Sequence, residues 1–125
     1  MKEVMAIIRM NKMNETKKAL TKAGFPSMTA TGRVLGRGKG YVDYKLLEGA
    51  AKGHPEAISQ LSGSPKMMAK RLIIMVVKDE NVEKVVSTLI QVNKTGNPGD
   101  GKIFVSPVSD SYRVRTGEHG DITLD

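Results

Sequence analysis

The sequence contains no cysteine and only two histidines. Without cysteine there is no disulfide, no thiolate nucleophile and no sulfur-ligated zinc or iron–sulfur site. His54 and His119 each lie near a glycine or proline and have no second ligand at helical or hairpin spacing, so we expect loop residues rather than metal ligands. No serine stands in a Gly-x-Ser-x-Gly turn, which argues against hydrolase chemistry.

Long apolar runs are also missing. The longest, Leu72 to Val77, has the length of a strand, whereas a membrane-spanning helix needs about 20 apolar residues. The first residues enter a strand-like pattern without the apolar stretch of a secretory signal, so we expect a cytoplasmic protein with no membrane insertion. A chain of 125 residues has the size of one domain, and we expect residues 1–125 to form it.

Acidic residues are scarce in the first part of the chain. Residues 1–70 contain 13 Lys and Arg against 5 Asp and Glu, whereas residues 71–125 contain 7 against 8, within a net charge of +7. Such a surplus suits an anionic ligand or partner. Charge alone does not distinguish nucleic acid, nucleotide phosphate and a dicarboxylate.

The first half of the chain shows a strand, a helix and a second strand. The strand is expected at Glu3–Arg9, the helix at Asn11–Ala23 with Gly24 as its stop, and the second strand at Ser27–Leu35. Residues 36–69 then contain eight glycines and prolines. A connection of that length in a compact domain is functional or disordered, and we predict a mobile binding loop.

The second half repeats this order. A β-branched strand is expected at Arg71–Val77, followed by a helix that Asp79 would cap and in which apolar residues recur with helical spacing from Val82 to Ile90. Another strand is expected at Lys102–Val108, and a short one at Tyr112–Arg115 precedes a polar tail, residues 116–125.

The repeated β-α-β order predicts an α+β protein with the ferredoxin-like βαββαβ arrangement. In this fold an antiparallel four-stranded sheet carries two helices on one face. Met5, Ile7, Ile74 and Val76 place apolar groups on the other face as well. We therefore predict that subunits associate through their sheets or sheet edges.

Residues 95–105 carry the most chemical information. Gly96–Lys102 matches the G-x-x-x-x-G-K frame of a phosphate-binding loop, but Ile103 stands where magnesium-binding Ser or Thr belongs, and a strand follows instead of a helix. The segment is therefore either an anion-binding glycine turn with a lysine at its edge or a plain turn. Arg113 and Arg115, two apart on the expected strand, favour phosphate binding, with a solvated face as the alternative.

Two segments resemble the PII signal-transduction proteins. One is the run Thr-Gly-x-x-Gly-Asp-Gly-Lys-Ile-Phe-Val at 95–105, followed by Arg-x-Arg-Thr-Gly-Glu at 113–118. The other is the opening, residues 1–35, with Ala-Ile-Ile-Arg at 6–9 and the Gly-Phe and Met-Thr pairs at 24–25 and 28–29. The resemblance implies a homotrimer, or a hetero-oligomer with a paired PII-like subunit, that holds ATP or ADP in clefts between subunits.

The resemblance also implies ligand contacts. By position, those to phosphate would be Gly99, Asp100, Gly101, Lys102, Arg113 and Arg115, with Arg37 approaching from the loop's base. Those near adenine and ribose would be Ile7, Met28, Thr29 and Val76. Family members bind 2-oxoglutarate beside the nucleotide through a bridging Mg²⁺, and the residues at that position are Arg37, Gly38, Lys39, Gly40 and Lys70, of which Lys70 would pair with a carboxylate.

Two departures from the family pattern concern the long loop. Gly38 replaces the glutamine that helps to bind Mg²⁺ and 2-oxoglutarate, and the loop is longer and lacks the usual sequence around the modified tyrosine. Uridylylation is therefore not carried over to Tyr41 or Tyr44, for which contact with a partner is an equal alternative. The altered loop resembles the PII-like branch encoded with nitrogenase genes, which implies a regulator without enzymatic turnover that contacts nitrogenase.

Three alternatives stay open at this point. Within the family, the target could be an ammonium transporter or glutamine synthetase. A ferredoxin-like RNA-binding module would use the same sheet, although Phe25 and Phe104 are the only phenylalanines available for base stacking. A small phosphate-ester hydrolase could use Arg113 and Asp100.

Overall fold

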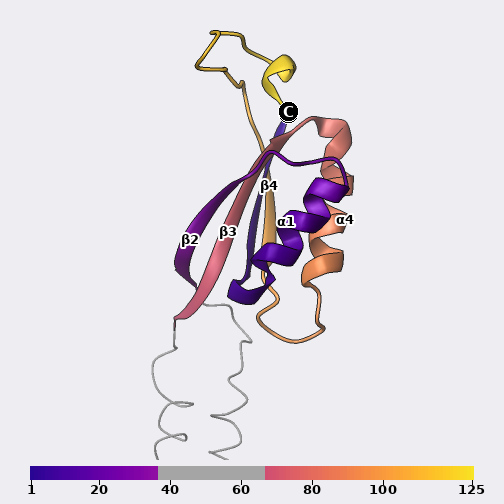
Figure 1. The fold of residues 1–125 in the computed structure, drawn as a ribbon, viewed down its shortest axis with the longest axis vertical. Coiled ribbons are helices and arrows are strands. Elements are labelled where there is room, and N and C mark those ends of the chain that lie inside the picture. The colour runs from indigo at the N-terminus through magenta and orange to yellow at the C-terminus, as the bar shows by residue number, and fades with distance from the viewer. Residues whose placement is uncertain (37–66) are drawn as a thin grey trace, which may run out of the picture.

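The computed structural model describes residues 1–36 and 67–125 of the chain (Figure 1). Its strands are β1 (Lys2–Arg9), β2 (Thr29–Gly36), β3 (Met68–Val77) and β4 (Lys102–Pro107), its helices are α1 (Met13–Lys22) and α4 (Val82–Asn93), and its short 3-10 turns are η1 (Met10–Lys12), η2 (Asp79–Asn81) and η3 (Asp121–Thr123). The order confirms the predicted α+β fold with four strands and two helices.

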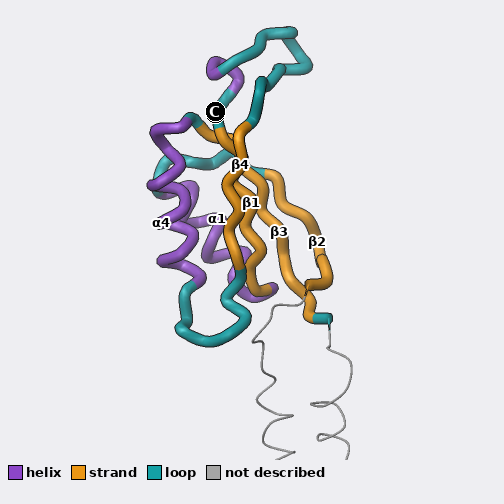
Figure 2. The backbone as a smooth tube through the Cα atoms, turned by 180° about the vertical axis from the view of Figure 1, so that it is seen from behind, coloured by secondary structure: helices purple, strands orange, loops and turns teal. Residues whose placement is uncertain are grey.

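The four strands form one antiparallel sheet in the order β2-β3-β1-β4. Central strand β1 pairs with β3 along its whole length, from Lys2 opposite Val77 to Arg9 opposite Lys70. Strands β2 and β4 are the two edges. Both helices cover the same face, as the view from behind in Figure 2 makes clear.

Side chains alternate between the two faces of the sheet because a strand has a period of two. On β1, Val4, Ala6 and Ile8 are buried beneath the helices, where Leu20 and Leu89 meet them. The intervening residues of β1 and β3 on the uncovered face are only partly buried. This uncovered face carries apolar side chains, which supports the expectation of association through the sheet.

Helix α1 ends as expected but begins two residues late, because Met10–Lys12 form a 3-10 turn. At its end Gly24 has a φ of 98°, and the amides of Phe25 and Gly24 donate to the carbonyls of Leu20 and Thr21. These two bonds form a Schellman motif, which requires the left-handed conformation that glycine adopts readily.

The expected capping role of Asp79 is wrong. Its side chain makes no capping bond; the carboxylate lies 3.0 Å from the amino group of Met1 instead. The residue that precedes α4, Asn81, also lacks a side-chain cap. Tertiary proximity of the chain start to the β3–α4 connection thus decides the role of Asp79.

The expected strand at Tyr112–Arg115 is also wrong. Only Tyr112 pairs, in an isolated bridge with His119, and a turn follows it. The amide of Gly117, which has a φ of 74°, donates to the carbonyl of Arg113 and closes that turn. The chain therefore folds back on itself in a C-terminal lobe, residues 108–125, instead of extending along the sheet.

Both strands that flank the long connection extend further than expected. Strand β2 reaches Gly36 and β3 begins at Met68, because Leu35 and Gly36 pair with Ala69 and Met68. The remainder of the predicted loop, residues 37–66, lies outside the described residues. Across the parts that the structure does describe, neither helix has the length and apolar character needed to span a bilayer.

Candidate functional site

The connection between α4 and β4 is a glycine turn, residues 95–102. Gly96, Gly99 and Gly101 have φ angles of 85°, 97° and 114°. These angles fall in the left-handed region, where a residue with a Cβ is strained. The glycines whose spacing predicted either an anion-binding turn or a plain turn therefore correspond to a backbone that only glycine adopts without strain at three positions.

Asp100 organises this turn from within. Its carboxylate accepts hydrogen bonds from the amides of Thr95 (2.8 Å) and Gly96 (3.1 Å), and from the Thr95 hydroxyl. Arg9 adds a fourth donor at 3.0 Å. The hydrogen bond from the Thr95 hydroxyl, followed by those from the amides and Arg9, holds the pKa of Asp100 well below its ordinary value. The Asp100 carboxylate thus holds the two ends of the turn together and ties the turn to β1.

We expect Asp100→Asn to destabilise the protein by about 1 kcal/mol at pH 7, the value of a charged hydrogen bond discounted for solvent screening. Because folding lowers the pKa of Asp100, its contribution is present above its ordinary value of 3.8 and is lost as pH falls below it. The difference between wild type and D100N in urea unfolding should therefore shrink below about pH 4. A difference that is constant with pH would contradict this role.

Two cations hold the turn against the sheet. Arg9 donates to the carbonyl of Pro98 at 3.0 Å, and the Nζ of Lys70 donates to the carbonyl of Gly99 at 2.7 Å. Arg9 and Lys70 are direct partners across β1 and β3. Burial, and then the charge of Arg9, lower the pKa of Lys70, against the opposing effect of Asp100. The family resemblance implied a ligand role for Lys70, whereas nothing in the sequence indicated the role of Arg9.

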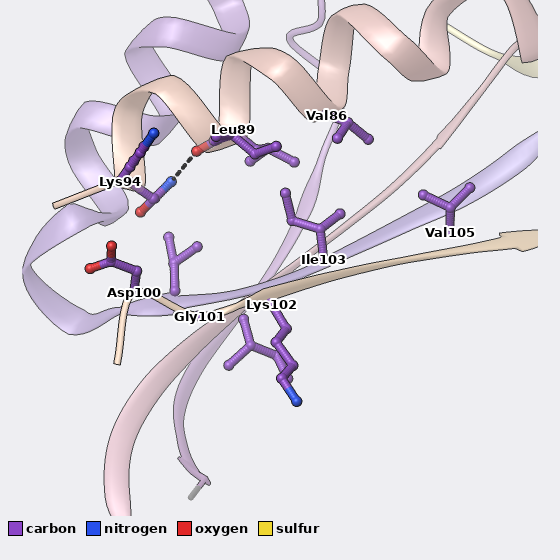
Figure 3. Close-up of a pocket in the computed structure, with 12 residues that line it drawn as sticks. Val86, Leu89, Lys94, Asp100, Gly101, Lys102, Ile103 and Val105 are labelled. Carbon is purple, nitrogen blue, oxygen red and sulfur yellow. Dashed lines mark hydrogen bonds between the residues drawn. The ribbon is translucent and has the colours of Figure 1, made fainter. Parts of the chain in front are cut away.

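Gly101 marks the closest approach of the turn to the sheet. A Cβ at this position would lie 1.8 Å from the carbonyl oxygen of Ile7. The next residue, Lys102, pairs with Ile7 and is exposed. Within residues 1–36 and 67–125 its side chain makes no hydrogen bond or ion pair, and Figure 3 shows it on the side of β4 opposite α4. Among these residues Lys102 is thus a free cation beside the preformed turn.

A groove of about 350 Å³ runs between α4 and β4 and ends at the glycine turn. Apolar residues Val86, Leu89 and Ile103 line its wall, and Asp100 and Gly101 lie at its end (Figure 3). The dashed bond in Figure 3 is the one that the Asn93 amide donates to the Leu89 carbonyl. The same amide also donates to the hydroxyl of Thr16 on α1, and this second bond ties the two helices together next to the turn.

The expected site residues fall into separate groups. Within one chain, the residues that lie close together are Ile7, Lys70 and residues 99–102. Thr29 lies on β2, at the opposite edge of the sheet from β4, and neighbouring Met28 packs against the core. Val76 lies on β3 opposite Glu3, four residues along that strand from the residue that pairs with Ile7.

The two arginines lie at the other end of the molecule from the glycine turn. Strand β4 lies between the arginines and the turn, and its six residues span about 20 Å at 3.3 Å per residue. Figure 1 shows the C-terminal lobe and the turn at opposite ends of the sheet. Arg113 and Arg115 therefore do not meet the turn within one chain.

Several residues singled out in the sequence lie outside the described part of the chain. They are Arg37, Gly38, Lys39, Gly40, Tyr41, Tyr44 and His54.

The structure also bears on the alternatives of other classes. Phe25 is buried in the core and only Phe104 is exposed on the sheet, so the phenylalanines form no stacking platform for bases. The carboxylate of Asp100 already accepts four hydrogen bonds. Its turn and the C-terminal lobe that holds Arg113 lie at opposite ends of the sheet (Figure 1), so the two residues do not form a joint hydrolytic site in one chain.

Comparison with known proteins bears on the same segments. Residues 1–118 match the family model of nitrogen regulatory protein P-II. The chain is 46% identical to nitrogen fixation nifHD region GlnB-like protein 2 of Methanothermobacter marburgensis, over 99% of this chain and 100% of that protein. It is 43% identical to the nifHD1 region GlnB-like protein 2 of Methanosarcina barkeri, over 99% of both chains.

A more distant relative carries the family's general name. Nitrogen regulatory protein P-II of Pyropia yezoensis is 38% identical, over 94% of this chain and 95% of that protein. The family match covers the glycine turn, Lys70 and both arginines, and the higher identities are to proteins of the nitrogen fixation regions. The chain therefore belongs to the P-II family of nitrogen regulatory proteins, in its nif-associated, GlnB-like branch.

Proposed function

We propose that the protein binds ATP or ADP together with 2-oxoglutarate and regulates a target by protein contact, without turnover of its own. The observation that carries this proposal is the preformed glycine turn, in which the Asp100 carboxylate is satisfied internally while Lys102 has no polar partner among the described residues. Backbone amides of a glycine turn and a lysine beside them suit the phosphates of a nucleotide. Residues 99–102 would hold these phosphates from one subunit.

A second subunit would complete the nucleotide site. Thr29 and the two arginines cannot reach the turn of their own chain, whereas β2 and β4 are the two edges of the sheet. Contact between unlike edges of neighbouring copies is head-to-tail, and such contacts form a ring when the rotation between copies closes. In a homotrimer, or in a hetero-oligomer with a paired PII-like subunit, Met28, Thr29, Arg113 and Arg115 of one copy would face the turn of the next.

Lys70 is the residue best placed to couple 2-oxoglutarate to the nucleotide. Its side chain is buried, and the only hydrogen bond its ammonium makes among the described residues is to the carbonyl of Gly99 in the glycine turn. A carboxylate bound at Lys70 would share the ammonium with that carbonyl, so the ligand would be linked directly to the turn that would contact phosphate. The Asp100 carboxylate already accepts four hydrogen bonds, so oxygens of phosphate and 2-oxoglutarate, not those of Asp100, would supply ligands to a Mg²⁺ ion.

Nitrogenase is the target that the relatives favour. Those with the higher identities are named for the nifHD region, and the departures of the long loop from the family pattern agree with this branch. Residues 37–66 would supply the contact, and 2-oxoglutarate with ATP would release the target. An ammonium transporter or glutamine synthetase is the alternative target. Capture of nitrogenase by the tagged protein that responds to neither ligand would rule out this regulation.

Calorimetric titration tests the proposed ligands directly. We expect ATP to bind, and 2-oxoglutarate with Mg²⁺ to change its affinity. Lys102→Ala should weaken ATP binding by roughly 10- to 100-fold, since a charged hydrogen bond contributes about 1.5–3 kcal/mol. Lys70→Met should abolish the effect of 2-oxoglutarate. Lys17→Ala, the same charge change on the exposed face of α1, is the control and should bind like wild type. No heat with ATP would contradict the proposal.

A further inference from the structure

Arg113 is held inside the C-terminal lobe. Its Nη1 donates to the carboxylate of Glu118 at 2.8 Å, and its Nη2 donates to the carbonyl of Ile122 at 3.1 Å. The backbone amide of Arg113 also donates to the carbonyl of Glu118 at 2.8 Å. Glu118 therefore fixes both the backbone and the side chain of this arginine, with Asp125 3.9 Å from Nη2 as a further acidic neighbour.

Arg115 has a different environment. It is exposed, and in the described part of the chain it makes no hydrogen bond or ion pair. Val114, between the two arginines, is fully exposed. The lobe thus presents one arginine that is already oriented and one that is free of such contacts, although the sequence places both in the same short motif.

The contacts of Arg113 do not consume its hydrogen-bonding capacity. A guanidinium has five N–H donors in a fixed fork, and the bonds to Glu118 and Ile122 use one on each terminal nitrogen. The side chain keeps 29% of its surface exposed. A phosphate can therefore be bound by the remaining donors while Glu118 stays in place.

We propose that Glu118 is a positioning residue for nucleotide binding, which holds Arg113 in the orientation that meets a phosphate. Fixing a long side chain before the ligand arrives removes ordering cost from the binding step. Glu118 would orient Arg113 in the way that residues behind the ligands of a metal site orient those ligands. This inference rests on the proposed nucleotide site.

The test is ATP titration of Glu118→Gln, which keeps the shape of the side chain and removes its charge. We expect about tenfold weaker binding, the lower end of the loss found when an outer-shell partner is removed from a metal site. The matched control is Asp121→Asn, which removes the same charge from the same lobe at an exposed side chain that makes no hydrogen bond or ion pair in the described chain. It should bind ATP like wild type or slightly more tightly.

A double-mutant cycle separates positioning from general disruption of the lobe. If Glu118 acts through Arg113, then Glu118→Gln should have no further effect in an Arg113→Ala background. Additive losses would overturn the inference, because Glu118 would then act by another route. Hydrogen exchange of the Gly117 amide, which donates to the Arg113 carbonyl, reports whether each variant keeps the lobe folded.

The remaining outcomes are distinguishable. If wild type binds ATP and Glu118→Gln matches Asp121→Asn, this inference fails and the proposed function stands. Tighter binding by Glu118→Gln would mean that the carboxylate competes with phosphate for Arg113, which also overturns it. Absence of ATP binding by wild type would overturn both.

Discussion

Gly101→Ala should destabilise the protein by about 3–5 kcal/mol and abolish nucleotide binding, because the new Cβ has no space. The Cβ would lie 1.8 Å from the carbonyl oxygen of Ile7, and that oxygen is backbone of the central strand, which cannot move aside alone. The φ of 114° adds strain for any residue with a side chain. Thermal unfolding should show a fall of about 10 °C or more.

Gly96→Ala is the control for this substitution. Gly96 lies in the same turn with a φ of 85°, but a Cβ there meets nothing within 4 Å. It should cost only about 1–2 kcal/mol, the strain of a left-handed residue, and leave the contact between β4 and β1 intact. Equal losses for the two variants would show that strain, not the approach to Ile7, makes Gly101 necessary.

Co-assembly of two defective chains should restore nucleotide sites that neither chain forms alone. Lys102→Ala removes the lysine beside the glycine turn, and Arg115→Ala removes the exposed arginine of the C-terminal lobe. Each variant alone should bind ATP roughly 10- to 100-fold more weakly than wild type. In a ring with one site between each pair of neighbours, random equal mixing makes about a quarter of the sites intact.

Calorimetry on the co-expressed, doubly tagged oligomer measures this fraction. Double tagging retains only mixed rings, so a stoichiometry of about one third at wild-type affinity is expected for a trimer, because each mixed ring has one site that takes Lys102 from one copy and Arg115 from the next. The separately purified variants, mixed without subunit exchange, are the control and should show no such sites. If co-assembly restores none, the two residues serve the same chain or different ligands, and the site between subunits is wrong.

Much of the fold could be predicted because it depends on local pattern. The apolar alternation of residues 3–9 and the helical spacing from Val82 to Ile90 report on neighbours within a few residues, and both elements are present. The alternation at Tyr112–Arg115 misled for the same reason. It fits a strand, yet two later glycines with positive φ, Gly117 and Gly120, let the chain turn back and pair with itself.

The candidate site was less predictable from sequence than the fold. Residues 95–102 could be identified from the sequence as a turn and as a candidate anion site, because glycines and a lysine stand together. The part played by Arg9 could not, since its proximity to Lys70 depends on the pairing of β1 with β3 across 61 positions in the chain. For Asp100, the family resemblance implied a phosphate contact, and only the structure shows that its carboxylate accepts hydrogen bonds from the backbone of the turn.

The order of strands and helices and the glycine-rich character of the turn are therefore properties of the sequence alone, because they arise from periodicity and from the conformational freedom of single residues. Only the tertiary structure decided which residues share a site. The sheet order puts β2 and β4 at opposite edges, and β4 carries the arginines away from the turn. Within a single chain the glycine turn and the two arginines therefore lie apart, because hydrogen bonding between distant strands, not spacing along the sequence, sets the distance between them.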